Sequence, residues 1–144
     1  HIRLHAKKDD IIELLMTIPG IGEYSAFLIQ AEIGDINRFP KPKKLVSYAG
    51  LNPGTDMSGK HHYDKGITKQ GNSWLRWVLV QDAPHAARTD ARFKNIYESI
   101  SRRKGKNTAK VAVAREILQA VYWVLKKHEP YCPKSVIPAD YMVP

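Results

Sequence analysis

The sequence predicts a mainly α-helical protein, and three observations support this fold class. Apolar side chains recur every three or four residues in several segments, as at Val111, Ala114, Leu118 and Val121, which is the period of a helix with one buried face. Residues that begin or end helices, chiefly Asp, Pro and Gly, flank these segments. The chain has 144 residues, of which 43% are hydrophobic, enough for a core. The exception is a long, basic, glycine-rich loop at about 52–72, with room for a short β-hairpin.

The first half of the chain is expected to contain three helices. An aspartate just before residue 11 can cap a short helix over residues 11–16. An apolar periodic run then forms a second helix, which Gly34 is placed to end. After a proline-containing loop, Pro42 can occupy the first turn of a third helix that ends near Ala49.

The second half is also expected to contain three helices, over residues 73–85, 91–103 and 108–127. Pro84 should kink or end the first of them, because proline lacks an N–H and clashes with the preceding turn. Gly105 should separate the second from the third. The tail over residues 129–144 is rich in proline and should be irregular.

The net charge of +9 is distributed unevenly along the chain. Residues 1–37 carry three basic and six acidic side chains, residues 38–76 carry eight and two, and residues 77–144 carry twelve and six. A positive field over the middle and C-terminal parts favours a polyanionic partner, most simply nucleic acid. The alternative is a basic surface that only keeps the protein soluble.

Composition also excludes several classes of protein. Cys132 is the single cysteine, which excludes a disulfide framework and a cysteine-rich zinc site and suits a reducing cytoplasm. The longest apolar stretch, residues 111–125, is interrupted by Arg115, Glu116 and Gln119. No segment is therefore expected to span a membrane, and a cytoplasmic location is expected.

The segment IPGIG at residues 18–22 resembles the hairpin of the helix-hairpin-helix element of many DNA-binding proteins. Gly20 and Gly22 permit φ > 0 and leave backbone N–H groups uncovered at a helix N-terminus, where a phosphate oxygen binds favourably. Such a contact fixes position and reads no base sequence. Glu23 stands where a basic residue usually follows the hairpin, so the alternative is a tight turn that only packs two helices together.

The loop at about 50–73, here called the Ser-Gly loop, holds groups suited to chemistry on a phosphodiester. Ser58 stands before Gly59, which leaves the backbone open to close approach. The two neighbouring histidines, His61 and His62, can accept a proton or hold a phosphate. Four cationic side chains can neutralise phosphate oxygens: Lys60, Lys65, Lys69 and Arg76. Residue types alone do not separate a nucleophile from an ordinary turn serine.

An ordered series of short motifs surrounds this loop. It consists of Y-x-G-L-x-P, then Ser-Gly, then G-x-I-x-K-x-G-N, then L-R, at Tyr48, Gly50, Leu51, Pro53, Ser58, Gly59, Gly66, Ile67, Lys69, Gly71, Asn72, Leu75 and Arg76. The series resembles the C-terminal domain of the DEDD-type insertion-sequence transposases that a bridge RNA guides, the "one-ten" insertion-sequence family. A helix-hairpin-helix belongs to the same domain in that family, so the resemblance covers about residues 10–127.

The resemblance implies a DNA recombinase in which Ser58 attacks a DNA phosphate and forms a covalent phosphoserine link. Members are similar in having an upstream RuvC-like domain with four acidic metal ligands, for which this chain shows no matching pattern. The resemblance therefore implies no metal or cofactor in this chain, Mg²⁺ only in that absent domain, and no activity for the chain alone. It also implies DNA, a structured guide RNA and further copies of the protein as partners.

On this interpretation residues 1–144 form a single C-terminal transposase domain, with the hairpin element at about 9–34, the Ser-Gly loop, C-terminal helices at about 73–128 and the irregular tail. Two alternatives are a non-catalytic helix-hairpin-helix module that binds nucleic-acid backbone and a helical domain that oligomerises through residues 111–125. Trp74, Trp77 and Trp123 lie in helical segments and are expected in the core rather than as base-stacking platforms.

Overall fold

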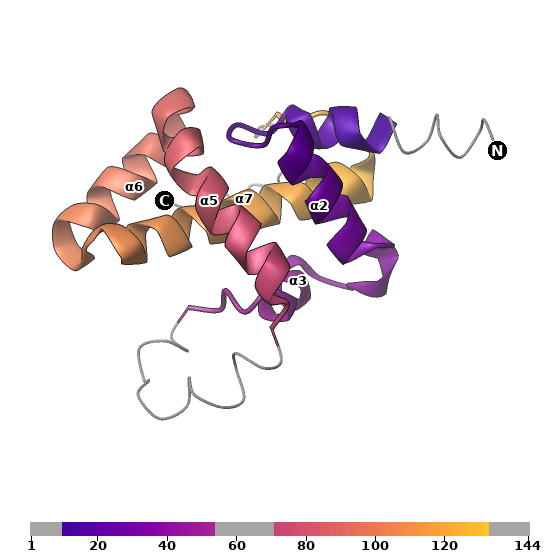
Figure 1. Ribbon diagram of the computed structural model, residues 1–144, viewed down its shortest axis with the longest axis horizontal. Helices are drawn as coiled ribbons and strands as arrows, with labels where there is room; N and C mark the ends of the chain where they lie inside the picture. The colour runs from indigo at the N-terminus through magenta and orange to yellow at the C-terminus, as the bar shows by residue number, and fades with distance from the viewer. Residues whose placement is uncertain (1–9, 54–70, 133–144) are drawn as a thin grey trace.

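The computed structural model describes residues 10–53 and 71–132, and these residues form helices and no strand (Figure 1). The predicted mainly α-helical class is confirmed for this part of the chain. The β-hairpin considered within 52–72 falls almost entirely outside the described residues and stays a prediction.

Short helices and tight turns make up residues 10–53. Residues 10–16 are helical, and α2 (Glu23–Ile33) ends at Gly34, whose φ of 69° suits glycine. The proline-containing loop holds a 3₁₀ turn, η1 (Ile36–Arg38), which the Asp35 side chain caps. α3 (Pro42–Tyr48) has proline in its first turn, as expected.

Three longer helices make up the second half: α5 (Ser73–Thr89), α6 (Ala91–Lys104) and α7 (Lys106–Lys127). The Asn72 side chain caps α5 and the Asp90 side chain caps α6. Gly105, with φ of 96°, separates α6 from α7 as predicted.

α5 was predicted to kink or end at Pro84. It does not end there, because the helix continues to Thr89. Proline removes one helix hydrogen bond, but Ala83 just before it and Ala86 and Ala87 on the following turn are buried. Their packing stabilises the continued helix and outweighs the local preference.

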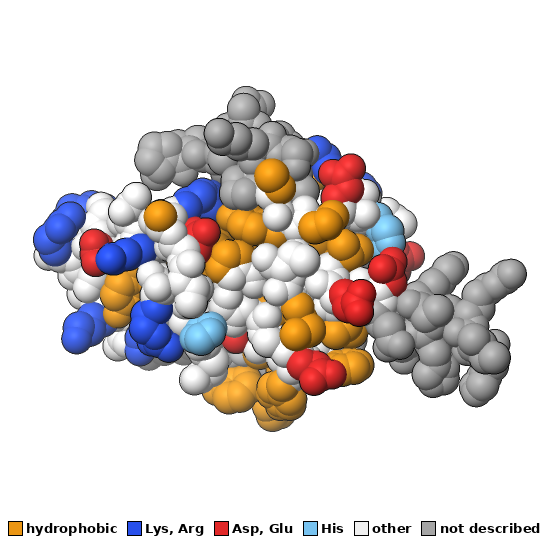
Figure 2. Space-filling model, turned by 90° about the horizontal axis from the view of Figure 1, so that it is seen from above, with side chains coloured by type: hydrophobic (Ala, Val, Ile, Leu, Met, Phe, Trp, Pro, Cys, Tyr) orange, Lys and Arg blue, Asp and Glu red, His pale blue; other side chains and the backbone are white. Residues whose placement is uncertain are grey.

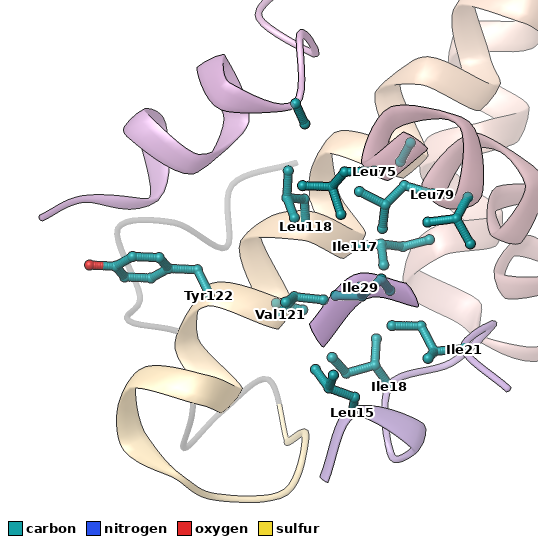
Figure 3. Close-up of a cluster of buried hydrophobic side chains, with 14 of the residues drawn as sticks. Leu15, Ile18, Ile21, Ile29, Leu75, Leu79, Ile117, Leu118, Val121 and Tyr122 are labelled. Atoms are coloured by element: carbon teal, nitrogen blue, oxygen red, sulfur yellow. The ribbon is translucent and has the colours of Figure 1, made fainter. Parts of the chain in front are cut away.

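α7 is the element around which the others are arranged. It packs against α3, α5, α6 and η1, while α2 packs on α5. In Figure 1 α7 runs behind α5 and α2, with α6 beside it at one end of the molecule. Side chains from distant parts of the sequence meet in its core: Leu15, Ile18, Ile21, Ile29, Leu75, Leu79, Ile117, Leu118 and Val121 (Figure 3).

The apolar face of α7 therefore packs against other helices of the same chain. Ala114, Leu118 and Val121 are fully buried, and the hydroxyl of Tyr122 donates to the carbonyl of Phe39 at 3.1 Å. Val111 and Leu125, at the two ends of this face, are only partly buried, and pairing with a second subunit stays a prediction. Among the described residues no helix is both long and apolar enough to cross a membrane.

Candidate functional site

The two ends of the Ser-Gly loop lie against each other. A Cβ atom built on Gly71 would lie 3.0 Å from the Cα atom of Gly50, and one built on Gly50 would lie 2.5 Å from Nη1 of Arg76. Gly50 also has a φ of 74°, which side chains rarely adopt. Glycine at both positions is therefore what allows the chain to leave and return at one point.

Asn72 fixes the returning end of the loop to two other helices. Its backbone N–H donates to the carbonyl of Tyr48 at 2.6 Å, and its side-chain oxygen accepts from the N–H of Leu75 at 2.9 Å. Its amide Nδ2 donates to Oε1 of Glu32 at 2.8 Å and to the Tyr48 hydroxyl at 3.2 Å. One side chain thus caps α5 and joins it to α2 and α3.

Two arginines hold the departing end. Nη1 of Arg76, on α5, donates to the carbonyl of Ala49 at 3.4 Å, and Nε of Arg115, on α7, donates to the carbonyl of Leu51 at 2.8 Å. The amide of Asn52 donates to the Ser47 hydroxyl at 2.8 Å. We call these contacts, with those of Asn72, the loop base.

Tyr48 lies at the centre of the loop base. Its hydroxyl donates to the carbonyl of Glu32 at 3.2 Å, and the guanidinium of Arg38 lies 4.9 Å from its ring centroid. Hydrogen bonding by Arg38 and then by Asn72 lowers the pKa of Tyr48 below its usual range. The tyrosine of the Y-x-G-L-x-P motif therefore has a structural role in joining α2, α3 and α5.

Most of the predicted site residues fall outside the described residues: Ser58, Lys60, His61, His62, Lys65 and Lys69. Their predicted roles stay predictions. Arg76 is described, and its half-buried guanidinium lies in the loop base. Arg115 had no predicted role at the site, because a single cation within an apolar helix gives no sequence signal of a contact 64 residues away.

The two hairpin glycines have different environments. Gly20 has φ of 92°, and a Cβ there would lie 2.8 Å from Cβ of Ala86 and 2.9 Å from the carbonyl oxygen of Asp82. Gly20 thus allows the hairpin to pack closely on α5. Gly22 has an ordinary φ of −95° and precedes α2 without a side-chain cap, and it has open space around it.

A buried polar pair lies beside the hairpin. The Ser25 hydroxyl donates to Oδ1 of Asp82 at 2.7 Å, and both residues are buried. Oδ2 of Asp82 has no hydrogen-bond partner among the described residues. Burial raises the pKa of Asp82 to about 6, although the Ser25 hydrogen bond partly opposes the shift.

The expectation that the three tryptophans lie in the core is wrong for two of them. Trp74 is 61% exposed and Trp77 is 46% exposed, because Leu75, Val78 and Leu79 occupy the buried face of α5. Trp123 is half-buried and contacts Tyr122 edge to face. In the described ranges no group of three or more His, Cys, Asp or Glu side chains is placed to bind a metal ion.

Comparison with known proteins agrees with the motif series. Residues 12–98 match the family described as "Transposase IS116/IS110/IS902 family". The chain is 31% identical over 132 residues to the transposase for insertion sequence element IS1111A of Coxiella burnetii, covering 88% of this chain and 36% of that protein. It is 32% identical over 123 residues to the pilin gene-inverting protein of Moraxella bovis, covering 82% and 38%.

A further relative is a probable family 20 transposase of Pseudomonas aeruginosa, 28% identical over 137 residues, covering 92% of this chain and 40% of that protein. The chain thus spans well under half the length of these relatives. The family match covers the hairpin, the loop base apart from Arg115, all of α5 and the first part of α6. This chain belongs to the IS116/IS110/IS902 transposase family.

Proposed function

We propose that this chain is the part of a DNA transposase that supplies the serine nucleophile. The observation that carries the proposal is the loop base, where α2, α3, α5 and α7 together hold the ends of the Ser-Gly loop. Precise placement of a reacting group requires rigid support from surrounding elements. A loop that only connected α3 to α5 would not need hydrogen bonds from four helices.

In the proposed reaction, the Ser58 hydroxyl oxygen attacks a DNA phosphorus atom. One phosphoester bond forms to Ser58 as the bond to a deoxyribose oxygen breaks. The serine proton passes to a base, and the departing deoxyribose oxygen gains a proton. Attack by a hydroxyl of another strand reverses these changes, rejoins the DNA and frees Ser58, so the phosphoester is conserved throughout.

Phosphate binding is assigned to the cations of the loop. Lys60, Lys65 and Lys69 would neutralise phosphate oxygens, and His61 and His62 would contact them. Arg76 uses Nη1 at the loop base, and a guanidinium has five N–H donors. Its remaining donors would serve a phosphate held beside the loop.

The rest of the proposed machinery lies outside this chain. From the family resemblance, Mg²⁺ is assigned to an upstream RuvC-like domain, where it would stabilise the attacking and leaving oxygens. The chain alone is then expected not to cleave DNA. A structured guide RNA would select the target, and several copies of the protein would act together.

A second candidate function is a non-catalytic helix-hairpin-helix module. The N-terminus of α2 favours it, because Gly22 provides no side-chain cap and leaves space for a phosphate. Glu23 in the first turn of α2 opposes it, since this carboxylate already complements the positive end of the helix. The loop base has no role in such a module.

The decisive experiment uses the full-length transposase. Ser58→Ala should abolish strand cleavage and exchange and leave nucleic-acid binding nearly unchanged, because the change removes the nucleophile and keeps the cations. Ser58→Cys should retain at most a trace of activity, since the thiolate differs in size and position. Ser99→Ala, at an exposed serine on α6, is the matched control and should recombine normally.

A covalent protein–DNA adduct should also be trapped with the wild-type enzyme and mapped by mass spectrometry. An adduct on Ser58 supports the proposal. An adduct on another residue, or full recombination by Ser58→Ala, removes Ser58 from the mechanism and favours the binding module.

A further inference from the structure

The turn between α6 and α7 carries five cationic residues and no acidic one. α6 ends with Arg102, Arg103 and Lys104, Gly105 forms the turn, and α7 begins with Lys106 and continues through Lys110. All five cationic side chains are exposed except Lys110, which is half-buried. We call these five residues the basic turn.

The charge is concentrated at one end of the molecule. Figure 2 shows Lys and Arg side chains gathered at the end where α6 and α7 meet in Figure 1, and most Asp and Glu side chains on the other half. A positive potential therefore extends from this end, and a polyanion would be attracted to it.

The basic turn has no acidic partner in the described part of the chain. Ion pairs there join Arg92 to Glu116 at 2.7 Å and His128 to Asp10 at 2.8 Å. Glu116 is the next acidic residue after the basic turn, and Arg92 already occupies it. None of the five cations therefore has an ion-pair partner in the described part of the chain, although Arg102, Arg103 and Lys104 complement the negative end of the α6 dipole.

One of these cations, Lys106, opposes the dipole of α7. The positive end of a helix dipole lies at its N-terminus, where acidic side chains are favourable and basic ones are not. α7 has Lys106 as its first residue, no acidic residue in its first turn and no side-chain cap at Gly105. This arrangement costs stability in the free protein, and a bound anion would reverse the cost.

We propose that the basic turn binds the sugar–phosphate backbone of duplex DNA, as an anchor separate from the Ser-Gly loop. Cations at a helix N-terminus suit phosphate oxygens, because backbone N–H groups there are unpaired within the helix. The end of a helical pair fits against the phosphates that border the wide major groove of B-form DNA. The major groove of A-form RNA is too narrow and deep for such an approach.

The basic turn and the loop base are connected through α7. Lys106 and Arg115 are nine residues apart on α7, which corresponds to about 14 Å along the helix axis. Arg115 holds the loop base through Leu51. Nine residues also correspond to about two and a half turns, so the two side chains leave α7 on opposite sides, and the basic turn is separate in position from the loop base.

The inference rests on the proposed function for the identity of the partner, DNA, and does not depend on Ser58. It is tested with this chain and a short fluorescein-labelled DNA duplex, by anisotropy over a range of salt concentrations. Lys106→Gln/Lys110→Gln should weaken binding about tenfold and reduce the slope of log K against log salt by about 2, since each lost phosphate contact removes about 0.9.

The matched control is Lys126→Gln/Lys127→Gln, which removes the same charge from exposed residues at the other end of α7. It should change the slope by much less. Circular dichroism and the thermal midpoint of Lys106→Gln/Lys110→Gln should show an intact fold, with the midpoint unchanged or raised, because the Lys106 charge is removed from the positive end of the helix.

Equal effects of both double variants, no effect of either, or no binding of the duplex would overturn the inference. A loss seen only with an RNA duplex of the same sequence would assign the surface to RNA instead. The outcomes are separable from the test of Ser58. A salt slope that does not depend on the basic turn would not change the result of adduct mapping at Ser58. An adduct on another residue would not change the salt slope.

Discussion

Asp82 shows how one residue can set a pH dependence in this fold. Its carboxylate lies between α2 and α5, where Ser25 supplies its hydrogen bond. Its pKa is raised from 3.8 to about 6, chiefly by burial. The folded state therefore binds this proton more tightly than the unfolded state does. The stabilisation is complete below about pH 4 and is lost as the pH rises through about 6.

We expect Asp82→Asn to remove this pH dependence. The Asn oxygen can still accept from Ser25, and no charge is buried at any pH. The stability of the variant relative to wild type should therefore rise between pH 4 and pH 7.5, by up to about 3 kcal/mol from the size of the shift. Urea unfolding followed by circular dichroism at several pH values measures the difference.

Asp35→Asn is the control, because Asp35 is an exposed cap of η1. Asp35→Asn removes one carboxylate charge, as Asp82→Asn does, but at an exposed position. A stability difference for Asp82→Asn that does not vary with pH would show that this carboxylate does not titrate between pH 4 and pH 7.5.

At the scale of elements, the hairpin and α5 depend on each other. Gly20 lies against the backbone of α5 at Asp82 and Ala86, on either side of Pro84. The close approach requires a residue without a side chain on the hairpin and small residues on the helix. The same packing that keeps α5 helical beyond its proline therefore also positions the N-terminus of α2.

We expect alanine substitutions at the two hairpin glycines to change the free energy of unfolding by different amounts. Gly20→Ala should lower the free energy of unfolding by about 2 kcal/mol or more, since it combines a φ of 92° with two contacts under 3.0 Å. Gly22→Ala should cost less than about 1 kcal/mol, since its φ is ordinary and its surroundings are open. Chemical denaturation compares the two.

The same pair tests the hairpin as a phosphate site. Gly22→Ala stays folded and places a methyl group beside the first N–H groups of α2, so DNA affinity should fall if they bind phosphate. Unchanged affinity in this variant would show that the hairpin only packs α2 against α5.

At the scale of the whole molecule, α7 contacts helices that lie far apart in the sequence. Its residues contact α3, η1, α5 and α6, and Arg115 reaches the loop base. A change in the buried middle of α7 should therefore affect the entire fold rather than one helix pair.

Ile117→Ala is expected to lower the free energy of unfolding by about 2–5 kcal/mol, because Ile117 is fully buried and its removal leaves a cavity. Trp74→Ala, which removes a larger but 61% exposed side chain, should cost less than about 1 kcal/mol. Urea unfolding by circular dichroism ranks the two, and a larger loss for Trp74→Ala would contradict the burial described here.

Much of the helical framework was predictable from short-range signals. Apolar periodicity, together with Gly34, Pro42 and Gly105, gave the approximate bounds of the helices, because capping and proline or glycine effects act within one turn. The motif series also indicated the family. These features depend on residues within a few positions of each other, which a linear sequence contains in full.

Tertiary structure alone decided the remaining features. α5 passes Pro84, and Trp74 and Trp77 face outward, because long-range packing selects which face of the helix is buried. The loop base joins Leu51 to Arg115 and Glu32 to Asn72, pairs separated by 64 and 40 residues. Sequence determines which groups can bond, but only the folded core fixes which of them come within 3 Å, since that choice depends on how all the helices share one interior.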